Sequence, residues 1–126
     1  SWAGFSFELL CLSHAKQIRK KLGISGVTTY TSSWRSRTEE ADGAQIDLII
    51  DRNDHVINLC EMKFSKREFT ITKDYDRILR NKMATFAEET QTKKAIHLTL
   101  ITTYGVKRNE YWGNIQGEIK LDDLFS

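Results

Sequence analysis

Residues 5–22 carry apolar side chains at the spacing of an α-helix. They recur every three or four positions, which is the repeat of one helix face. Gly23 follows and favours a helix end, because glycine adopts the left-handed conformation that closes many helices. We expect the apolar positions to face the core. They form one row of Phe5, Leu9, Leu12 and Ala15 and a second row of Leu10 or Cys11, Ile18 and Leu22.

Three later segments have the composition of β-strands. Residues 27–34 are rich in Thr, Tyr and Val, and residues 44–51 and 56–64 are apolar and β-branched. The polar, acidic residues 35–43 between the first two are expected to form a loop. The cluster Arg52-Asn53-Asp54-His55 separates the last two, so they are expected to form a hairpin.

A second helix is expected to begin after Thr70 or Thr72, either of which can cap it, and to end near Gln91. Residues 95–103 then alternate as a strand does. Residues 111–120 favour one or two edge strands, and residues 121–125 a terminal helical turn. The inward stripe of the second helix is Tyr75, Ile78, Leu79, Met83 and Phe86, and its polar face carries Lys73, Arg77, Arg80 and Lys82.

The predicted order is therefore α-β-β-β-α-β with a short C-terminal addition. This order is typical of an α/β fold with a mixed sheet flanked by helices. A chain of 126 residues has the size of one domain, so residues 1–126 are expected to form a single unit. Its 29% charged and 40% hydrophobic residues exclude an intrinsically disordered chain, and no apolar run reaches the ~20 residues of a membrane span.

The net charge of +2 by itself argues against a nucleic-acid partner. It is an average, however, over blocks of opposite sign: residues 1–37 carry +5, residues 38–62 carry −6, residues 63–94 carry +4 and residues 95–126 carry −1. An acidic hairpin flanked by basic helices is compatible with a cation site beside a phosphate-binding rim. The charge distribution therefore leaves nucleic acid open.

The start of the chain and its cysteines bear on location. Ser1-Trp2-Ala3-Gly4 contains neither an initiator Met nor the features of a secretory signal, so we expect a piece of a longer protein. Cys11 and Cys60 form no C-x-x-C pair and lie in apolar surroundings, which favours small buried residues over disulfide or zinc roles. A cytoplasmic location follows as an expectation.

Three charged residues interrupt the predicted central strands. Asp47 lies among isoleucines and leucine, and Glu61 and Lys63 follow an apolar run. Strand geometry puts Glu61 and Lys63 on one face. If the hairpin pivots about Asp54, Asp47 lies directly opposite Glu61. Two carboxylates and an ammonium group then share one patch.

Two neighbouring carboxylates repel each other unless a cation lies between them, and hard oxygen ligands favour Mg²⁺ or Mn²⁺. Such a cation polarises a phosphoryl oxygen and acidifies bound water, which suits phosphodiester hydrolysis. The alternative is a plain Asp–Lys or Glu–Lys cross-strand ion pair.

Glu8 adds a third acid. It lies three residues after Phe5 and four before Leu12, so the expected apolar stripe turns it towards the sheet. Its alternative is a glutamate at a frayed helix start, stabilised by the helix dipole.

Aromatic residues beside cations are typical of single-strand or flipped-base binders. Trp34 with Arg35 is the first such pair, and Arg77 and Arg80 on the polar face of the second helix are further candidate nucleic-acid contacts. The alternative for the aromatic residues is packing at a strand edge.

Three segments resemble the PD-(D/E)xK nuclease superfamily. More narrowly, they resemble the nuclease-like domain at the C-terminus of archaeal-type P-loop ATPases, which also occur in bacteria. The similarity covers roughly residues 2–125, and Ile46 stands where the superfamily name has proline. The segments are Gly4-Phe5-Ser6-Phe7-Glu8, Gln45-Ile46-Asp47-Leu48-Ile49 and Cys60-Glu61-Met62-Lys63-Phe64.

This resemblance implies a restriction-endonuclease-like fold with a Mg²⁺- or Mn²⁺-dependent site that cleaves DNA. Asp47, Glu61 and the Met62 carbonyl are the implied metal ligands. Glu8 is implied as an outer or second-metal ligand, and Lys63 as the group that acts on the water or the phosphate. An ATPase domain in the same chain is also implied; it would precede these residues, which contain no G-x-x-x-x-G-K-S/T loop. The alternative is a catalytically idle module that binds nucleic acid or a partner, or regulates its ATPase.

Overall fold

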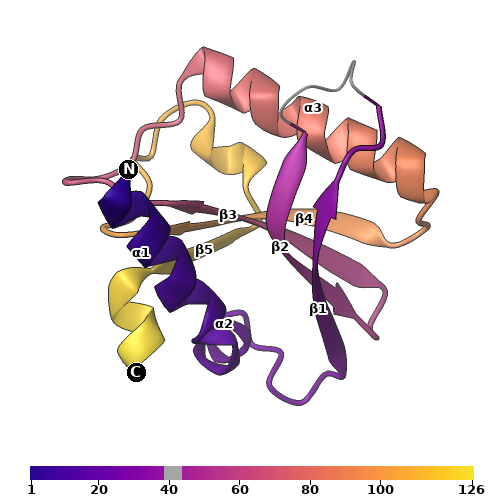
Figure 1. Cartoon of the computed structure of the whole chain (residues 1–126), viewed down its shortest axis with the longest axis horizontal. Helices are drawn as coiled ribbons and strands as arrows, with labels where there is room; N and C mark the ends of the chain where they lie inside the picture. Colours follow the sequence, from indigo (N-terminus) through magenta and orange to yellow (C-terminus); the bar gives the residue numbers. More distant parts are fainter. Residues whose placement is uncertain (39–43) are drawn as a thin grey trace.

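A five-stranded mixed sheet separates the helices into two layers in the computed structural model (Figure 1). The structure describes residues 1–38 and 44–126; the part of the predicted 35–43 loop that covers residues 39–43 lies outside them. The elements are α1 (Trp2–Leu12), α2 (Ala15–Lys21), β1 (Thr29–Arg35), β2 (Gln45–Arg52), β3 (Val56–Lys63), α3 (Lys73–Thr90), β4 (Ala95–Thr102), η2 (Trp112–Asn114), β5 (Gly117–Lys120) and η3 (Leu121–Phe125).

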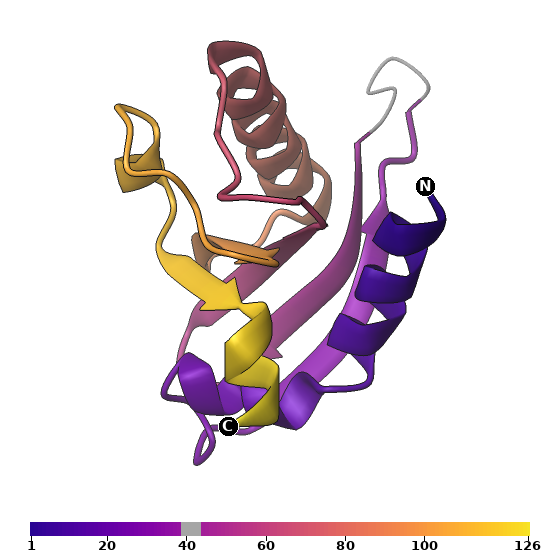
Figure 2. The ribbon, with the colours of Figure 1, turned by 90° about the vertical axis from the view of Figure 1, so that its left-hand side faces the viewer.

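The strands lie in chain order, β1-β2-β3-β4-β5. The β1–β2 and β2–β3 pairs are antiparallel, whereas β3–β4 and β4–β5 are parallel. Parallel neighbours need a long crossover, and α3 supplies it between β3 and β4. The helices α1 and α2 lie on one side of the sheet together with η3, and α3 lies on the other (Figure 2). The predicted α/β order and mixed sheet are confirmed.

Alternating strand residues build a core on each side of the sheet. Leu48 and Ile50 of β2 pack with Phe7, Cys11 and Ile18 of the N-terminal helices. Two clusters lie on the α3 side. One contains Ile49, Ile57, Leu59 and Phe86. The other contains Ile71, Leu79, Leu98 and Leu100.

The predicted first helix is wrong in two respects. It is broken at Ser13 and His14 into α1 and α2. The row expected to face the core is instead on the outside: Phe5, Leu9 and Leu12 are 53%, 51% and 43% exposed. The second row is the buried one. Helix α1 carries apolar residues on both faces, so its periodicity does not identify the inner face.

Helix α3 follows its prediction closely. Thr72 is the cap, since its side chain accepts a hydrogen bond from the Tyr75 amide, and Gln91 closes the helix in the left-handed conformation. The expected inward stripe differs at Ile78, which is 43% exposed, and Asp76 is buried in the helix. Arg80 and the Asn114 amide both donate to Asp76, so this buried carboxylate is paired.

The C-terminal prediction is confirmed in outline. Residues 111–120 contain one strand, β5, preceded by the short helix η2, and η3 forms the expected terminal turn. Among the residues that the structure describes, no helix combines the length and the apolar character needed to cross a membrane.

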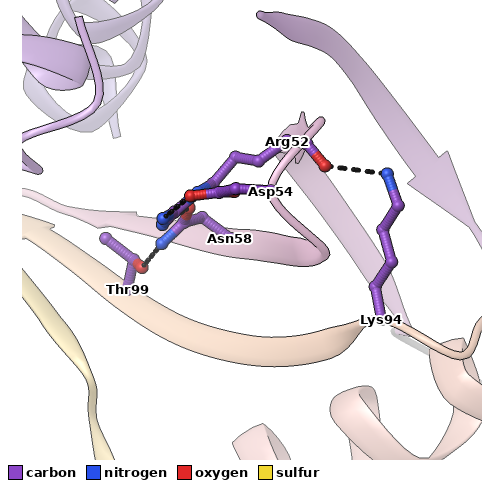
Figure 3. A network of polar contacts seen from close by, with 5 residues as sticks. All are labelled: Arg52, Asp54, Asn58, Lys94 and Thr99. Carbon is purple, nitrogen blue, oxygen red and sulfur yellow. Dashed lines mark hydrogen bonds and ion pairs between the residues drawn. The ribbon is translucent and has the colours of Figure 1, made fainter. Parts of the chain in front are cut away.

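A polar network fixes the end of the β2–β3 hairpin (Figure 3). Arg52 bonds both carboxylate oxygens of Asp54 at 2.9 and 2.7 Å and the Asn58 side-chain oxygen at 3.1 Å. The Asn58 amide donates to Thr99 of β4 at 3.0 Å, and Lys94 donates to the Arg52 carbonyl at 2.8 Å. Both Asn58 and Thr99 are almost fully buried. The network ties three strands together and holds their register.

Candidate active site

A pocket of about 180 Å³ lies at the end of the sheet where β2 begins and β3 ends. All four predicted catalytic residues line it, and they come from three elements. Glu8 comes from α1, Asp47 from β2, and Glu61 and Lys63 from β3. Met62, whose carbonyl is the other predicted metal ligand, lines the pocket too. The structure therefore brings together the residues that the sequence spacing connects.

The hairpin register agrees with the expected pivot. Leu48 pairs with Cys60, and both are six residues from Asp54. Continued by one position, this register puts Asp47 opposite Glu61, and both side chains line the pocket. The network around Arg52 lies at the other end of the same two strands and ties them together there.

A β-bulge in the pairing of β2 with β1 positions Asp47, and no pattern in the sequence predicts it. Ser32 pairs with Ile49 and Trp34 pairs with Ile46, so Asp47 and Leu48 together face Ser33 alone. A bulge bends its strand and re-aims the side chains there. Ile46 accordingly packs in the same core cluster as Ile49, three residues away, and not with Leu48.

Asp47 is half-buried and accepts a hydrogen bond from the Gln45 side-chain amide at 2.7 Å. Gln45 in turn accepts a hydrogen bond from Arg35 on the neighbouring strand β1 at 2.8 Å. This chain of contacts holds the Asp47 carboxylate from one side and leads from the pocket to an exposed arginine.

Glu61 forms an ion pair with Lys82 of α3. The ammonium nitrogen is 2.8 Å from the carboxylate oxygen, and the side chains are only 17% and 12% exposed for Lys82 and Glu61. The expectation that Lys82 lies on the solvent face of the helix is wrong. Helical spacing explains this: Lys82 is three residues after Leu79 and four before Phe86, both of which are buried.

Lys63 lies over an aromatic ring. Its ammonium nitrogen is 5.0 Å from the ring centroid of Tyr75, a cation–π contact that orients the lysine. Within the described residues Lys63 forms no ion pair with Asp47 or Glu61, so the plain cross-strand pair considered from the sequence does not form.

The Tyr75 hydroxyl is buried without a hydrogen-bond partner in the described part of the chain. Burial, reinforced by the Glu61 carboxylate, raises the pKa of Tyr75, so the ring stays neutral. The neutral ring is an apolar surface beside the Lys63 ammonium group.

Glu8 reaches the pocket for a different reason from the one expected. The stripe of Phe5 and Leu12 that placed it is exposed, but Glu8 follows buried Phe7 and precedes buried Cys11 on the inner face of α1. It is the seventh residue of α1, and the first turn holds no acidic residue. The helix-dipole alternative does not apply at that depth, since the dipole acts on the first turn.

The two cysteines remain thiols. Burial, together with nearby Glu8, raises the pKa of Cys11 to about 12, and burial raises the pKa of Cys60, which also lines the pocket. Protonated thiols neither attack a substrate nor bind soft metals. The donors that this pocket offers are therefore oxygens.

Oxygen donors of this kind fit Mg²⁺ or Mn²⁺, which commonly bind one or two carboxylates and keep several waters. No group of three or more His, Cys, Asp or Glu side chains is close enough to hold a metal within residues 1–38 and 44–126. Asp47 and Glu61 with the Met62 carbonyl would suffice for such a cation. Glu61 would then exchange its contact with Lys82 for the cation.

The predicted nucleic-acid contacts divide into two groups. Trp34 is half-buried, with its ring 5.4 Å from that of Phe86, and Arg35 is exposed beside Gln45. The side chains of Arg77 and Arg80 are 68% and 64% exposed, and the helical repeat places both on the side of α3 away from Lys82. Only Arg35 is connected to the pocket.

Comparisons of this chain with models of protein families, with curated proteins and with solved structures find no match.

Proposed function

We propose that this chain is a nuclease domain of the PD-(D/E)xK type, with a restriction-endonuclease-like core, that hydrolyses DNA phosphodiester bonds with Mg²⁺ or Mn²⁺. The observation that carries the proposal is the convergence of Glu8, Asp47, Glu61 and Lys63 on one polar pocket. Core packing does not explain why acids from three elements line one pocket, because carboxylates near one another repel. A cation held by Asp47 and Glu61 with the Met62 carbonyl would explain it.

The charges of the pocket suit this chemistry. Three acids and two lysines line it, which gives a formal charge of −1. One divalent cation changes that charge to +1 and so attracts a phosphodiester anion. The bound cation supplies a Lewis acid that polarises the phosphoryl oxygen and lowers the pKa of water.

The protein groups take the following roles. Asp47, Glu61 and the Met62 carbonyl hold the cation, with Glu8 as an outer or second ligand. Lys63, held over the Tyr75 ring, orients the phosphate or the attacking water. A water oxygen bonds to phosphorus, one phosphorus–oxygen ester bond breaks, and the water proton passes to the departing oxygen. The products are a phosphomonoester and an alcohol.

The attached ATPase and the cytoplasmic location belong to the same proposal. The ATPase rests on the resemblance of the three segments, and the location rests on Cys11 and Cys60, which form no C-x-x-C pair. Within this proposal, DNA approaches along the Arg35 side of the pocket, since Arg35 is joined to Asp47 through Gln45. Arg77 and Arg80, which are directed away from the pocket, would contact only DNA that continues over α3.

A second candidate is a catalytically idle module that binds nucleic acid or a partner, or regulates its ATPase. The Glu61–Lys82 ion pair favours it, because one candidate metal ligand is already neutralised within the protein. This candidate predicts DNA affinity that falls steeply with salt and no cleavage, or no DNA affinity and an ATPase rate that changes when the domain is deleted.

The test is cleavage of supercoiled plasmid DNA by the purified full-length protein with Mg²⁺, with Mn²⁺ and with excess EDTA. We expect nicked and linear products with either metal, none in EDTA, and recovery when the metal is restored. Cleavage that persists in EDTA contradicts a metal-dependent site. Salt-sensitive binding with no product in either metal favours the idle module.

A further inference from the structure

Lys82 has no role in the chemistry described so far, although its side chain is only 17% exposed. It reaches from the middle of α3 into the pocket and contacts Glu61 at 2.8 Å. The pocket therefore contains two lysines, one on β3 and one on α3.

We infer that Lys82 competes with the metal cation for Glu61 and, once displaced, binds the phosphate of the substrate. This inference rests on the proposed function and specifies how cation and substrate binding are coupled in that site.

Competition follows from charge. Lys82 contacts the Oε1 oxygen of Glu61 at 2.8 Å, so a divalent cation bound to the same carboxylate at about 2.1 Å would bring two positive charges next to the ammonium group. The cation must therefore take Glu61 from Lys82, and the energy of the ion pair is subtracted from the affinity for the cation. With little solvent around both side chains, separating this pair costs more than separating a surface pair, because it leaves a poorly solvated charge without a partner.

The charge and the length of the Lys82 side chain allow it to bind the substrate phosphate after it leaves Glu61. A displaced Lys82 beside a cation is a half-buried positive charge without a partner, which is costly unless an anion arrives. The four-carbon stem of lysine allows the ammonium group to move by several bond lengths while the helix stays in place. A phosphodiester bound at the cation would be the nearest available anion, and its affinity would then depend on Lys82.

A purely structural tether between α3 and β3 would give a different result. Its loss would lower stability without tightening cation binding. The two interpretations therefore differ in the sign of the change in cation affinity, which is measurable without any catalysis.

The test compares Lys82→Met with wild type and with Lys73→Met, which replaces an exposed lysine at the start of the same helix. Isothermal titration with Mn²⁺ in the absence of DNA should give a Kd about threefold to tenfold lower for Lys82→Met, since one competing ion pair is gone. Affinity for a DNA duplex in Ca²⁺, used to limit turnover, should fall about tenfold. Lys73→Met should match wild type in both measurements.

Lys82→Arg provides a second test of the inference if Lys82→Met does not fold. Its guanidinium binds a carboxylate more firmly through two parallel hydrogen bonds, so Mn²⁺ affinity should be weaker than that of wild type. Unchanged or weaker Mn²⁺ affinity in Lys82→Met overturns the inference while wild-type cleavage leaves the proposed function standing. A wild-type protein that binds no Mn²⁺ overturns both.

Discussion

Replacing Asp47 by asparagine is expected to lower the rate of metal-dependent DNA cleavage by about a hundredfold to a thousandfold, the cost typical of removing one group that stabilises the transition state. Asparagine has the shape of aspartate and can still accept the hydrogen bond from Gln45, so packing is conserved. The negative charge that holds the cation is lost. The thermal midpoint Tm should stay the same or rise slightly, because one of three neighbouring acids is neutralised.

Asp51→Asn is the matched control for this measurement. Asp51 lies on the same strand, four residues away, and pairs with Lys94 at the other end of the hairpin. The pair is partly exposed, so its loss should cost no more than about 1 kcal/mol and should leave the rate of cleavage unchanged. If Asp47→Asn cleaves as fast as Asp51→Asn, Asp47 is not part of the active site.

Asn58→Ala is expected to lower the free energy of unfolding by about 2–4 kcal/mol, the sum of an unpaired buried polar group and a small cavity. Asn58 is 1% exposed and links Arg52 to Thr99. Without it the Arg52 guanidinium loses one acceptor and the hydroxyl of Thr99 loses its donor. Urea denaturation followed by circular dichroism measures the difference.

Asn53→Ala, in the exposed turn of the same hairpin, is the control and should change stability by less than about 0.5 kcal/mol. Because the network lies at the opposite end of the hairpin from the pocket, the Asn58 variant should keep its cleavage rate per folded molecule at low temperature. Equal denaturation midpoints for the two variants would show that the network does not stabilise the hairpin.

The hairpin and its register could be predicted from the sequence because strand parity is a strict rule. Asp47 and Glu61 are fourteen residues apart around a recognisable turn, and an even separation places both on one face. The convergence of the two strands on one pocket follows from that arithmetic. The bulge at Asp47 could not be predicted in this way. It arises from a shift in the pairing of β2 with β1, which the residues around Asp47 do not indicate.

The helices show where periodicity is insufficient. In α1 both faces are apolar, and the sheet covers the face with Phe7 and Cys11, leaving Leu9 exposed. Glu8 lies on the inner face of α1, as predicted, but the stripe of Phe5 and Leu12 on which that prediction relied is exposed. In α3 the buried stripe of Leu79 and Phe86 runs past Lys82, so helical spacing contained the signal for this residue, but its charge suggested the solvent face.

The most direct test of the central claim is a crystal of the protein soaked in Mn²⁺ and measured at the manganese absorption edge. We expect an anomalous peak in the pocket within about 2.0–2.4 Å of carboxylate oxygens of both Asp47 and Glu61, with the Lys82 ammonium group no longer in contact with Glu61. An intact Glu61–Lys82 ion pair with no anomalous peak beside Asp47 would contradict a metal-dependent nuclease site in this protein.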